Sequence, residues 1–420
     1  MTKIALLNIG SELLVGRTVN TNASKMALML RAKGFHLETT AVCHDTEQDI
    51  RYWIDELLGR HEVVLITGGL GPTKDDITKK VLQERFGGEM QVHQPTLDAI
   101  SAFLSSRHRP LLEQNRQQAF VPSSCEVIMN AYGTAPGMAF REEGKLVVSM
   151  PGVPMEMTHL MQEHIVPMME RDFPVIEMHT RIIRTVGIPE SRIADKMEGI
   201  EQRMPVGLQI AYLPSYEGTK IELRMKGNDA SAIIEEIEAA QRIIARTFAK
   251  YVYSLEDKSP STLLKEYMFK EGKTMATAES CTGGAIAALM VQHSGISSYF
   301  KGGVVAYMRE VKESVLGVKP ETIDTHGIVS EQVAKEMARG AREKLGSDFA
   351  VSITGIAEAP EGVPVEEMPQ CWIGFSDRRG EQAFFFRLFR QRKQNIAIAT
   401  QASVIYALRC LQGKELREEY

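Results

Sequence analysis

The sequence predicts an α/β protein in three parts: a parallel-sheet domain at residues 1–170, a small α+β module at 171–255 and a second α/β domain at 256–420. A chain of 420 residues is longer than one ordinary hydrophobic core can organise. Strand-like and helix-like runs alternate over about the first 170 residues, as in parallel βαβ units. Between residues 174 and 254, short runs instead alternate polar and apolar positions, as half-exposed strands do.

The composition excludes several classes of protein. Its 44% hydrophobic and 25% charged residues are ordinary for a soluble globular chain. Basic residues number 49 against 54 acidic ones, and this net charge of −5 argues against binding to nucleic acid or to an anionic membrane. The five cysteines include no CxxC pair, which argues against a zinc site and favours the reducing cytoplasm. No apolar stretch approaches the roughly 20 residues that span a bilayer.

In the first domain, apolar β-branched runs predict strands, and apolar residues at helical spacing predict helices. The expected strands are residues 4–9, 36–42 and 62–66, and the expected helices are 21–33, which ends at Gly34, and 49–58. Ligands of parallel sheets bind where strands end and loops lead into helices. The loop after residue 66 therefore occupies the position of a binding loop.

The same patterns predict the elements of the other two parts. The expected strands are residues 181–186, 220–225, 274–278, 303–307 and 349–353, and the expected helices are 191–197, 230–249, 263–269, 330–344 and 396–411. Ser261 or Thr262 is expected to cap the helix at 263–269. The middle module carries no obvious catalytic cluster.

The segment TGGLGPTKDDIT, residues 67–78, follows an expected strand and predicts an anion site. Glycines let backbone N–H groups approach a ligand closely, and the start of a helix favours negative charge. Asp75 and Asp76 add hard oxygen ligands that suit a divalent metal bridging phosphates. Alternatively, Asp75 caps the next helix and Asp76 is merely solvated, as in most isolated Asp-Asp pairs.

Other polar loops at expected strand ends favour the site over that alternative. Glu12 lies in the segment GSELLVG after the first strand, and Asn22 lies in NTN, where it either caps a helix or holds a ribose. Two further Gly/Pro loops are NAYGTAPG at residues 130–137 and PGVPMEM at 151–157. Each alone predicts only a turn, whereas several at successive strand ends indicate a binding site.

A second site is predicted at AESCTGG, residues 278–284. Ser280 stands where a strand leads into a helix, so its hydroxyl is exposed and the following amides can stabilise an oxyanion. Lys312 is the candidate base, because a desolvated lysine has a lowered pKa. The alternatives are that Ser280 is a helix cap and Lys312 a surface lysine. Cys281 is a further candidate nucleophile, although such a cysteine is more often a small buried apolar residue.

These motifs, in this order and spacing, resemble the competence/damage-inducible CinA family along essentially the whole chain. The segments that carry the resemblance are GSELLVG, NTN, TGGLGPTKDD, NRQQAFVP, NAYGTAPG, PGVPMEM, TAESCTGG, GGVVAY, HGIVS and SITGIA. The resemblance implies a MoaB/MogA-like, molybdopterin-binding-like first domain, a KH-like middle module and a PncC-type amidohydrolase domain at the C-terminus. We also expect a homodimer.

For the first domain, the resemblance implies metal-dependent hydrolysis of ADP-ribose to AMP and ribose 5-phosphate. Gly68, Gly69 and Thr73 would then contact phosphate, with Asn22 also binding substrate. Asp75, Asp76 and Glu12 would hold Mg²⁺, Mn²⁺ or Co²⁺, and Asp76 would also be catalytic. The residues alone leave open which aspartate has which role.

For the C-terminal domain, the resemblance implies conversion of nicotinamide mononucleotide and water to nicotinate mononucleotide and ammonia, without a metal. Ser280 would be the nucleophile, Lys312 the base and Tyr307 a helper. The substrate would be bound by the residues Thr282, Gly283, Thr354 and Arg392.

Two segments depart from the family pattern. Where many members continue TGIA with GPGGG, this chain has Glu358, Pro360 and Glu361, which would repel a substrate phosphate. Near the end, Arg392 still takes the place of the family's first arginine, but Ile396 stands where the second is common. Phosphate binding is therefore expected to be impaired while the Ser–Lys chemistry is kept.

Two other functions remain open. Either only the N-terminal hydrolase is active and the C-terminal domain is a degraded nucleotide-binding unit, or the protein is a pterin-binding or competence accessory protein without hydrolase activity. The middle module has no GXXG nucleic-acid loop, and the net acidity also argues against nucleic acid.

Overall fold

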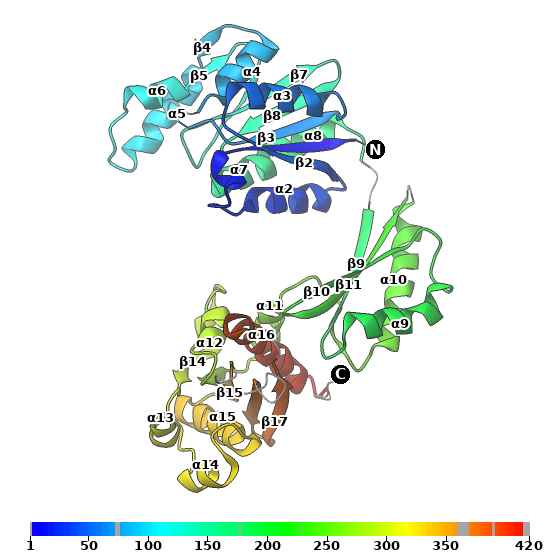
Figure 1. Ribbon diagram of the computed structural model, residues 1–420, viewed down its shortest axis with the longest axis vertical. Helices are drawn as coiled ribbons and strands as arrows, with labels where there is room; N and C mark the ends of the chain where they lie inside the picture. The colour runs from blue at the N-terminus through cyan, green and yellow to red at the C-terminus, as the bar shows by residue number, and fades with distance from the viewer. Residues whose placement is uncertain are drawn as a thin grey trace. The chain divides into compact units, whose positions relative to one another are not determined.

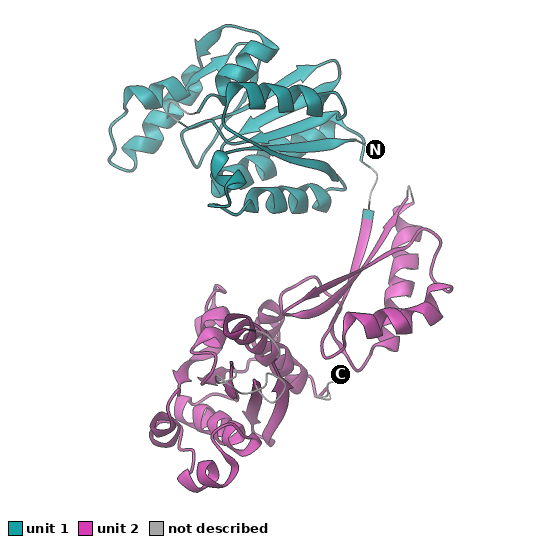
Figure 2. Cartoon of the chain, in the orientation of Figure 1, with its two compact units in different colours: residues 1–178 teal, residues 179–420 magenta. Residues whose placement is uncertain are grey.

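The computed structural model describes residues 2–71, 76–175, 178–227, 229–358, 369–388 and 391–414. The chain forms two compact units, Met1–Met178 and His179–Tyr420, which Figure 2 colours separately. The second unit contains both the middle module and the C-terminal domain (Figure 1). None of the described helices is both long enough and apolar enough to cross a membrane.

Unit 1 is built on a six-stranded sheet with the order β2-β1-β3-β8-β7-β6. Its parallel strands are β2 (Leu37–Cys43), β1 (Ile4–Ile9), β3 (Val63–Thr67) and β8 (Lys145–Met150). The strands β7 (Gly137–Glu142) and β6 (Glu126–Ile128) continue the sheet in antiparallel pairings. The predicted parallel sheet of the first domain is thus confirmed, with an antiparallel edge that the sequence analysis did not contain.

Helices cover both faces of this sheet, which explains why β1 and β3 are apolar at nearly every position. Ile4 and Leu6 pack on one face with residues of α2 (Thr21–Ala32) and α7 (Pro154–Leu160). Ala5 and Leu7 pack on the other face with α3 (Glu47–Leu58) and α4 (Thr78–Phe86). The remaining elements are α1 (Ser11–Leu14), β4 (Met90–Val92), α5 (Gln94–Ser105), α6 (Glu113–Gln118), β5 (Phe120–Pro122), a π-helical turn (Met161–Ile165) and α8 (Val166–Asp172).

The middle module is a four-stranded sheet with the order β10-β11-β9-β12. Its strands are β9 (Met178–Thr185), β10 (Gln209–Ser215), β11 (Gly218–Lys226) and β12 (Val252–Ser254). The helices α9 (Glu190–Glu201) and α10 (Ala230–Thr247) pack their apolar sides against one core with this sheet. In β11, Ile221 and Leu223 are fully buried as the alternating pattern predicts, but Glu222 between them is also buried, so the middle of the strand is not half-exposed as expected.

The C-terminal domain has a five-stranded sheet with the order β14-β13-β15-β16-β17. Its strands are β13 (Met275–Glu279), β14 (Phe300–Val305), β15 (Phe349–Ile356), β16 (Gln370–Asp377) and β17 (Gly380–Arg387). The first three are parallel, and β16 and β17 are antiparallel to their neighbours. The helices are α11 (Pro260–Lys270), α12 (Ala285–Met290), α13 (Arg309–Ser314), α14 (Pro320–His326), α15 (Glu331–Leu345) and α16 (Arg392–Leu411), with a 3₁₀ turn at Ile296–Ser298.

Two of the predicted elements are corrected by the structure. Neither Ser261 nor Thr262 caps α11; Ser259 does, through a 3.2 Å bond from the Thr262 amide, and Pro260 takes the first helical position, which it favours. The strand expected at residues 303–307 is Phe300–Val305. It begins earlier because its pairing with β13 already starts at Phe300, which lies opposite Met275.

Candidate active sites

Ser280 lies directly after β13, and its backbone amide donates a 3.0 Å hydrogen bond to Ile353 O on the adjacent strand β15. The ends of these parallel strands open into a cavity of about 270 Å³. The cavity is lined by Ser280, Cys281, Tyr307, Lys312, Ile328, Val329, Thr354, Gly355, Ile356, Ala357 and Arg392. Five residues that the sequence analysis singled out for this site, Ser280, Tyr307, Lys312, Thr354 and Arg392, therefore surround one space.

Lys312 extends from α13 to Ser280 and is only 1% exposed. Its Nζ donates hydrogen bonds to Ser280 Oγ at 2.9 Å and to the carbonyl oxygen of Ala306 at 2.6 Å. Burial of the amine lowers the pKa of Lys312 from 10.5 to about 8. The serine hydroxyl thus has beside it a base that is partly deprotonated near neutral pH.

Cys281 is a poor nucleophile in this environment. Burial raises the pKa of its thiol to about 12, so the thiolate is scarce at neutral pH. Its side chain packs in the hydrophobic core with Ile286 and Ile353. The geometry therefore favours Ser280 over Cys281 as the attacking group.

The expected backbone cradle after Ser280 is occupied by the chain itself. The carboxylate of Glu279, which is 1% exposed, accepts hydrogen bonds from the amides of Gly284 at 3.1 Å, Ile286 at 2.9 Å and Ala287 at 2.8 Å. It also accepts from the Thr282 hydroxyl at 2.7 Å. The anion at the start of α12 is thus a buried glutamate, and these amides cannot serve a substrate phosphate or an oxyanion.

The other expected ligand contacts divide between the cavity and its surroundings. Thr282 and Gly283 do not belong to the cavity lining, and the Thr282 hydroxyl is used by Glu279. Thr354 lines the cavity, and its hydroxyl donates to Ile328 O at 2.8 Å. Arg392 is exposed at the start of α16, and its guanidinium donates to Tyr307 Oη at 3.0 Å. Arg392 and Tyr307 together form one polar edge of the cavity.

The positions that depart from the family pattern are placed differently. Glu358 is exposed and directly follows Ala357 of the cavity lining, whereas Glu361 lies outside the described residues. Ile396 packs against the hydrophobic core, so it does not replace the family's second arginine as a phosphate-binding residue. Asn395, which the sequence analysis missed, is fully buried and donates to Ala357 O at 2.8 Å. The sequence signal that could have identified Asn395 is its polar side chain among the apolar positions of a helix.

In unit 1, a cavity of about 440 Å³ lies at the ends of β1, β3 and β8. Its lining is Ile9, Gly10, Glu12, Asp45, Gly68, Gly69, Leu70, Gly71, Asp76, Gln118, Thr134, Ala135, Pro151, Gly152, Val153 and Glu156. Four of the expected residues, Glu12, Gly68, Gly69 and Asp76, belong to this lining. Thr73 and Asp75 lie outside the described residues. Asn22 is not in the lining. Its side-chain amide donates a 2.8 Å hydrogen bond to the carbonyl oxygen of Gly152, which does line the cavity.

Gly68 and Gly69 have a structural reason to be glycine. Both have positive φ, and a Cβ at Gly68 would collide with Ile9 O while one at Gly69 would collide with Thr78 Oγ1. The Gly68 amide donates to Met150 O at 3.1 Å. The turn is therefore fixed by its packing on β1, and the Gly68 N–H is not available to a phosphate.

Carboxylates dominate the polar part of this cavity. Besides Glu12 and Asp76, the lining contains Asp45 and Glu156, which the sequence analysis did not select. Asp45 accepts a hydrogen bond from Ser11, and Glu156 accepts one from Asn130 Nδ2 at 2.7 Å. Burial raises the pKa of Glu156 above its usual range. Asp45 follows β2 by two positions, and that place after a strand was the signal for it.

The described part of unit 1 contains no group of three or more His, Cys, Asp or Glu side chains that could hold a metal ion. A resident metal with an all-protein ligand shell therefore does not fit these residues. Magnesium usually binds through one or two carboxylates together with substrate phosphates. Four carboxylates line this cavity, but the described ones are not grouped as the ligands of a resident metal ion.

Three family models match successive parts of the chain. They are the probable molybdopterin binding domain at residues 5–171, the damage-inducible protein CinA KH domain at 180–254 and the CinA C-terminal domain at 257–413. These matches agree with the expected succession of a molybdopterin-binding-like part, a KH-like part and a CinA C-terminal part.

Individual relatives extend over most of the chain. A CinA-like protein of Flavobacterium psychrophilum is 34% identical over 410 residues, which cover 96% of this chain and 98% of that protein. A CinA-like protein of Chlorobium chlorochromatii is 38% identical over 363 residues, or 86% of each chain. A crystal structure described as the protein CinA with unknown function, from Thermoplasma acidophilum, is 32% identical and covers 41% of this chain and 97% of that chain, with a TM-score of 0.36.

Proposed function

Because the chain belongs to the CinA family, we propose that its C-terminal domain hydrolyses nicotinamide mononucleotide to nicotinate mononucleotide and ammonia. The observation that carries this proposal is the 2.9 Å contact between Lys312 Nζ and Ser280 Oγ inside a cavity. A buried lysine with a pKa of about 8 next to a serine hydroxyl is the pair that nucleophilic acyl transfer needs.

The reaction proceeds in two balanced steps. Neutral Lys312 accepts the proton of Ser280 Oγ as this oxygen attacks the carboxamide carbon, and the C–N bond then breaks as Lys312 returns the proton to the leaving ammonia. In the second step, Lys312 takes a proton from water as the water oxygen attacks the Ser280 ester, and it returns that proton to Ser280 Oγ as the ester C–O bond breaks and the carboxylate is released. No redox partner or metal enters either step.

The oxyanion needs donors other than the three amides that Glu279 holds. We assign this role to the backbone amide of Cys281, the residue that follows the nucleophile and lines the cavity. Arg392 supplies the positive charge for the substrate phosphate from the polar edge that it shares with Tyr307. Ala306 O orients the Lys312 amine toward Ser280.

The test is a product assay with three substrates. Nicotinamide mononucleotide, nicotinamide riboside and nicotinamide contain the same carboxamide but progressively lose the phosphate and the ribose. From nicotinamide mononucleotide we expect ammonia and nicotinate mononucleotide in equal amounts, unaffected by chelator. For nicotinamide riboside we expect a higher KM, because it lacks the phosphate that Arg392 would bind. Equal KM values for the riboside and the mononucleotide would contradict the phosphate assignment, and absence of ammonia from all three would contradict the function.

We also propose that unit 1 hydrolyses ADP-ribose to AMP and ribose 5-phosphate. The specific observation is the set of four carboxylates, Glu12, Asp45, Asp76 and Glu156, around one cavity at the ends of parallel strands. A divalent metal carried in with the diphosphate would supply the positive charge that stabilises its oxygens. Glu156, whose pKa is raised, is suited to take a proton from the attacking water. AMP release that depends on added Mg²⁺, Mn²⁺ or Co²⁺ tests this activity separately.

A further inference from the structure

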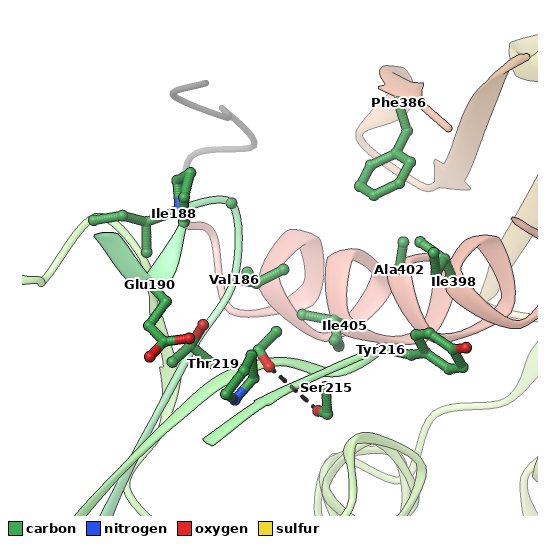
Figure 3. A pocket seen from close by; sticks show the side chains of 14 residues that line it. Val186, Ile188, Glu190, Ser215, Tyr216, Thr219, Phe386, Ile398, Ala402 and Ile405 are labelled. Carbon is green, nitrogen blue, oxygen red and sulfur yellow. Dashed lines mark hydrogen bonds between the residues drawn. The ribbon is translucent and has the colours of Figure 1, made fainter. Parts of the chain in front are cut away.

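Neither proposed activity uses a cavity of about 710 Å³ that lies between the middle module and the C-terminal domain of unit 2. One wall is the loop after β9, which contains Val186 and Ile188, and another is the tip of the β10–β11 hairpin with Tyr216. The third wall is helix α16, whose Ala402 and Ile405 face the same space (Figure 3). A volume of this size is typical of sites for small molecules.

The walls of this cavity are held by contacts between the two parts of unit 2 and within the middle module. Val186 and Tyr253 of the middle module belong to the same hydrophobic core as Ile405 of α16. The guanidinium of Arg409 on α16 donates to Lys250 O at 2.6 Å. The hairpin tip is anchored by the Tyr253 hydroxyl, which donates to Glu217 O at 3.2 Å. The cavity is therefore preformed.

The lining indicates the chemistry of the occupant. Most lining side chains are apolar, and water in such a space would find few hydrogen-bond partners. The hydroxyls of Ser215, Tyr216 and Thr219 supply a small number of polar positions. Glu190 is the single charged side chain among the described lining residues, and it disfavours anions. A phosphate-bearing nucleotide therefore does not fit, whereas an uncharged apolar molecule does.

Helix α16 connects this cavity to the Ser280 cavity. Its first turn carries Arg392 of the Ser280 cavity and Asn395, which holds the Ala357 carbonyl of that cavity's lining. Ala402 follows Asn395 by about two helical turns, roughly 10 Å along the same axis. A displacement of α16 by a molecule that contacts Ala402 is thus passed directly to two groups of the Ser280 cavity.

We propose that this cavity binds a small uncharged molecule with an aromatic or branched apolar body, and that binding shifts α16 and so alters the Ser280 cavity. Binding does not depend on the proposed amidohydrolase activity. The biological meaning of the effect on the Ser280 cavity rests on the proposed amidohydrolase function. The effect itself is measured without catalytic turnover.

The probe is N-phenyl-1-naphthylamine, a neutral dye whose fluorescence rises in apolar sites, compared with its sulfonated analogue 1-anilinonaphthalene-8-sulfonate. We expect the neutral dye to bind at least about fivefold more tightly, because Glu190 repels the sulfonate. Glu190→Gln should reduce that preference. Equal binding of both dyes to the native protein, or no fluorescence increase with the neutral dye, would overturn the proposal.

Two substitutions locate the dye. Ala402→Phe fills the cavity and should weaken binding by about tenfold or more, whereas Ala249→Phe adds the same ring at an exposed position outside the lining and should change nothing. Tyr216→Ala removes a half-exposed wall residue without a core change and should weaken binding several-fold, which keeps the test valid if Ala402→Phe misfolds. Unchanged affinity in both cavity variants would overturn the assignment.

The shift of α16 is measured by hydrogen exchange with and without the neutral dye. We expect altered exchange in peptides covering residues 349–358 and 392–399, and no change in α3 of unit 1. Dye binding that leaves the first two peptides unchanged would refute the coupling while leaving the binding site in place.

Discussion

Lys312 Nζ lies 2.9 Å from Ser280 Oγ, although the two residues are 32 positions apart in the chain. Parallel pairing of β13 with β14 brings them together, because Glu279 is opposite Val305 at the ends of the two strands. Ser280 follows the first strand, and the Ala306 carbonyl after the second holds the lysine amine. The sheet thus positions a nucleophile and a base by aligning the ends of two strands.

The rate of the proposed deamidation should follow the protonation of Lys312. Because burial lowers its pKa to about 8 and only the neutral amine can take the serine proton, kcat/KM should rise with pH and level off above about pH 8. Lys312→Arg keeps a cation but removes the base, and it should abolish ammonia release at every pH. A flat profile between about pH 6 and 9, or an active Lys312→Arg variant, would refute this role.

Glu279 should determine the local stability of α12. Glu279→Gln replaces a carboxylate that accepts three backbone amides with an amide group that carries two N–H donors, so at least one buried N–H loses its partner. Hydrogen exchange at Ile286 and Ala287 should accelerate by about tenfold or more, which corresponds to about 1.4 kcal/mol of local stability.

The matched control for that experiment is Glu271→Gln, which makes the same change at an exposed glutamate of the same domain. It should leave exchange in α12 unaltered, since exposed substitutions typically change stability by no more than about 0.5 kcal/mol. Equal exchange in the two variants would show that the Glu279 bonds do not stabilise the helix start.

Asp76 should be required for cleavage of ADP-ribose. Its carboxylate lies against Gly71 in the lining of the unit 1 cavity. Asp76→Ala should lower AMP release by about tenfold or more, equivalent to about 1.4 kcal/mol of transition-state stabilisation, and chelator should abolish it. Asp98→Ala, at an exposed position outside the cavity, is the control. Full activity of the Asp76 variant, or of the native protein in chelator, would reject the site.

The two acidic replacements after residue 357 should weaken substrate binding in the C-terminal site. Glu358 is exposed next to a lining residue, and a carboxylate near a phosphate costs on the order of 1–4 kcal/mol at a partly solvated position. Replacing Glu358 and Glu361 with glycine should lower KM for nicotinamide mononucleotide and leave kcat nearly unchanged. The hypothesis fails if the native protein already saturates at micromolar substrate, or if KM does not fall.

The sequence predicted the strand ends as the place of both sites because parallel βαβ patterns determine which loops meet. It could not show that Glu279 occupies the amides of α12, because both a substrate phosphate and a neighbouring carboxylate satisfy the same pattern. The lining role of Asp45 also required the sheet order, which places β2 beside β1. Sequence spacing likewise left open whether Lys312 is a surface lysine, because it contacts Ser280, which lies 32 positions earlier in the chain.

We propose that Ser280, activated by Lys312, is the nucleophile of a nicotinamide mononucleotide amidohydrolase. The most direct test measures ammonia release by the native protein, Ser280→Ala and Cys281→Ala at about pH 8.5, a pH above the lowered pKa of about 8 at which most Lys312 amines are neutral. The proposal predicts no ammonia from Ser280→Ala, ammonia from Cys281→Ala, and unchanged ADP-ribose cleavage by both variants. An active Ser280→Ala together with an inactive Cys281→Ala would contradict it and assign the reaction to the thiol.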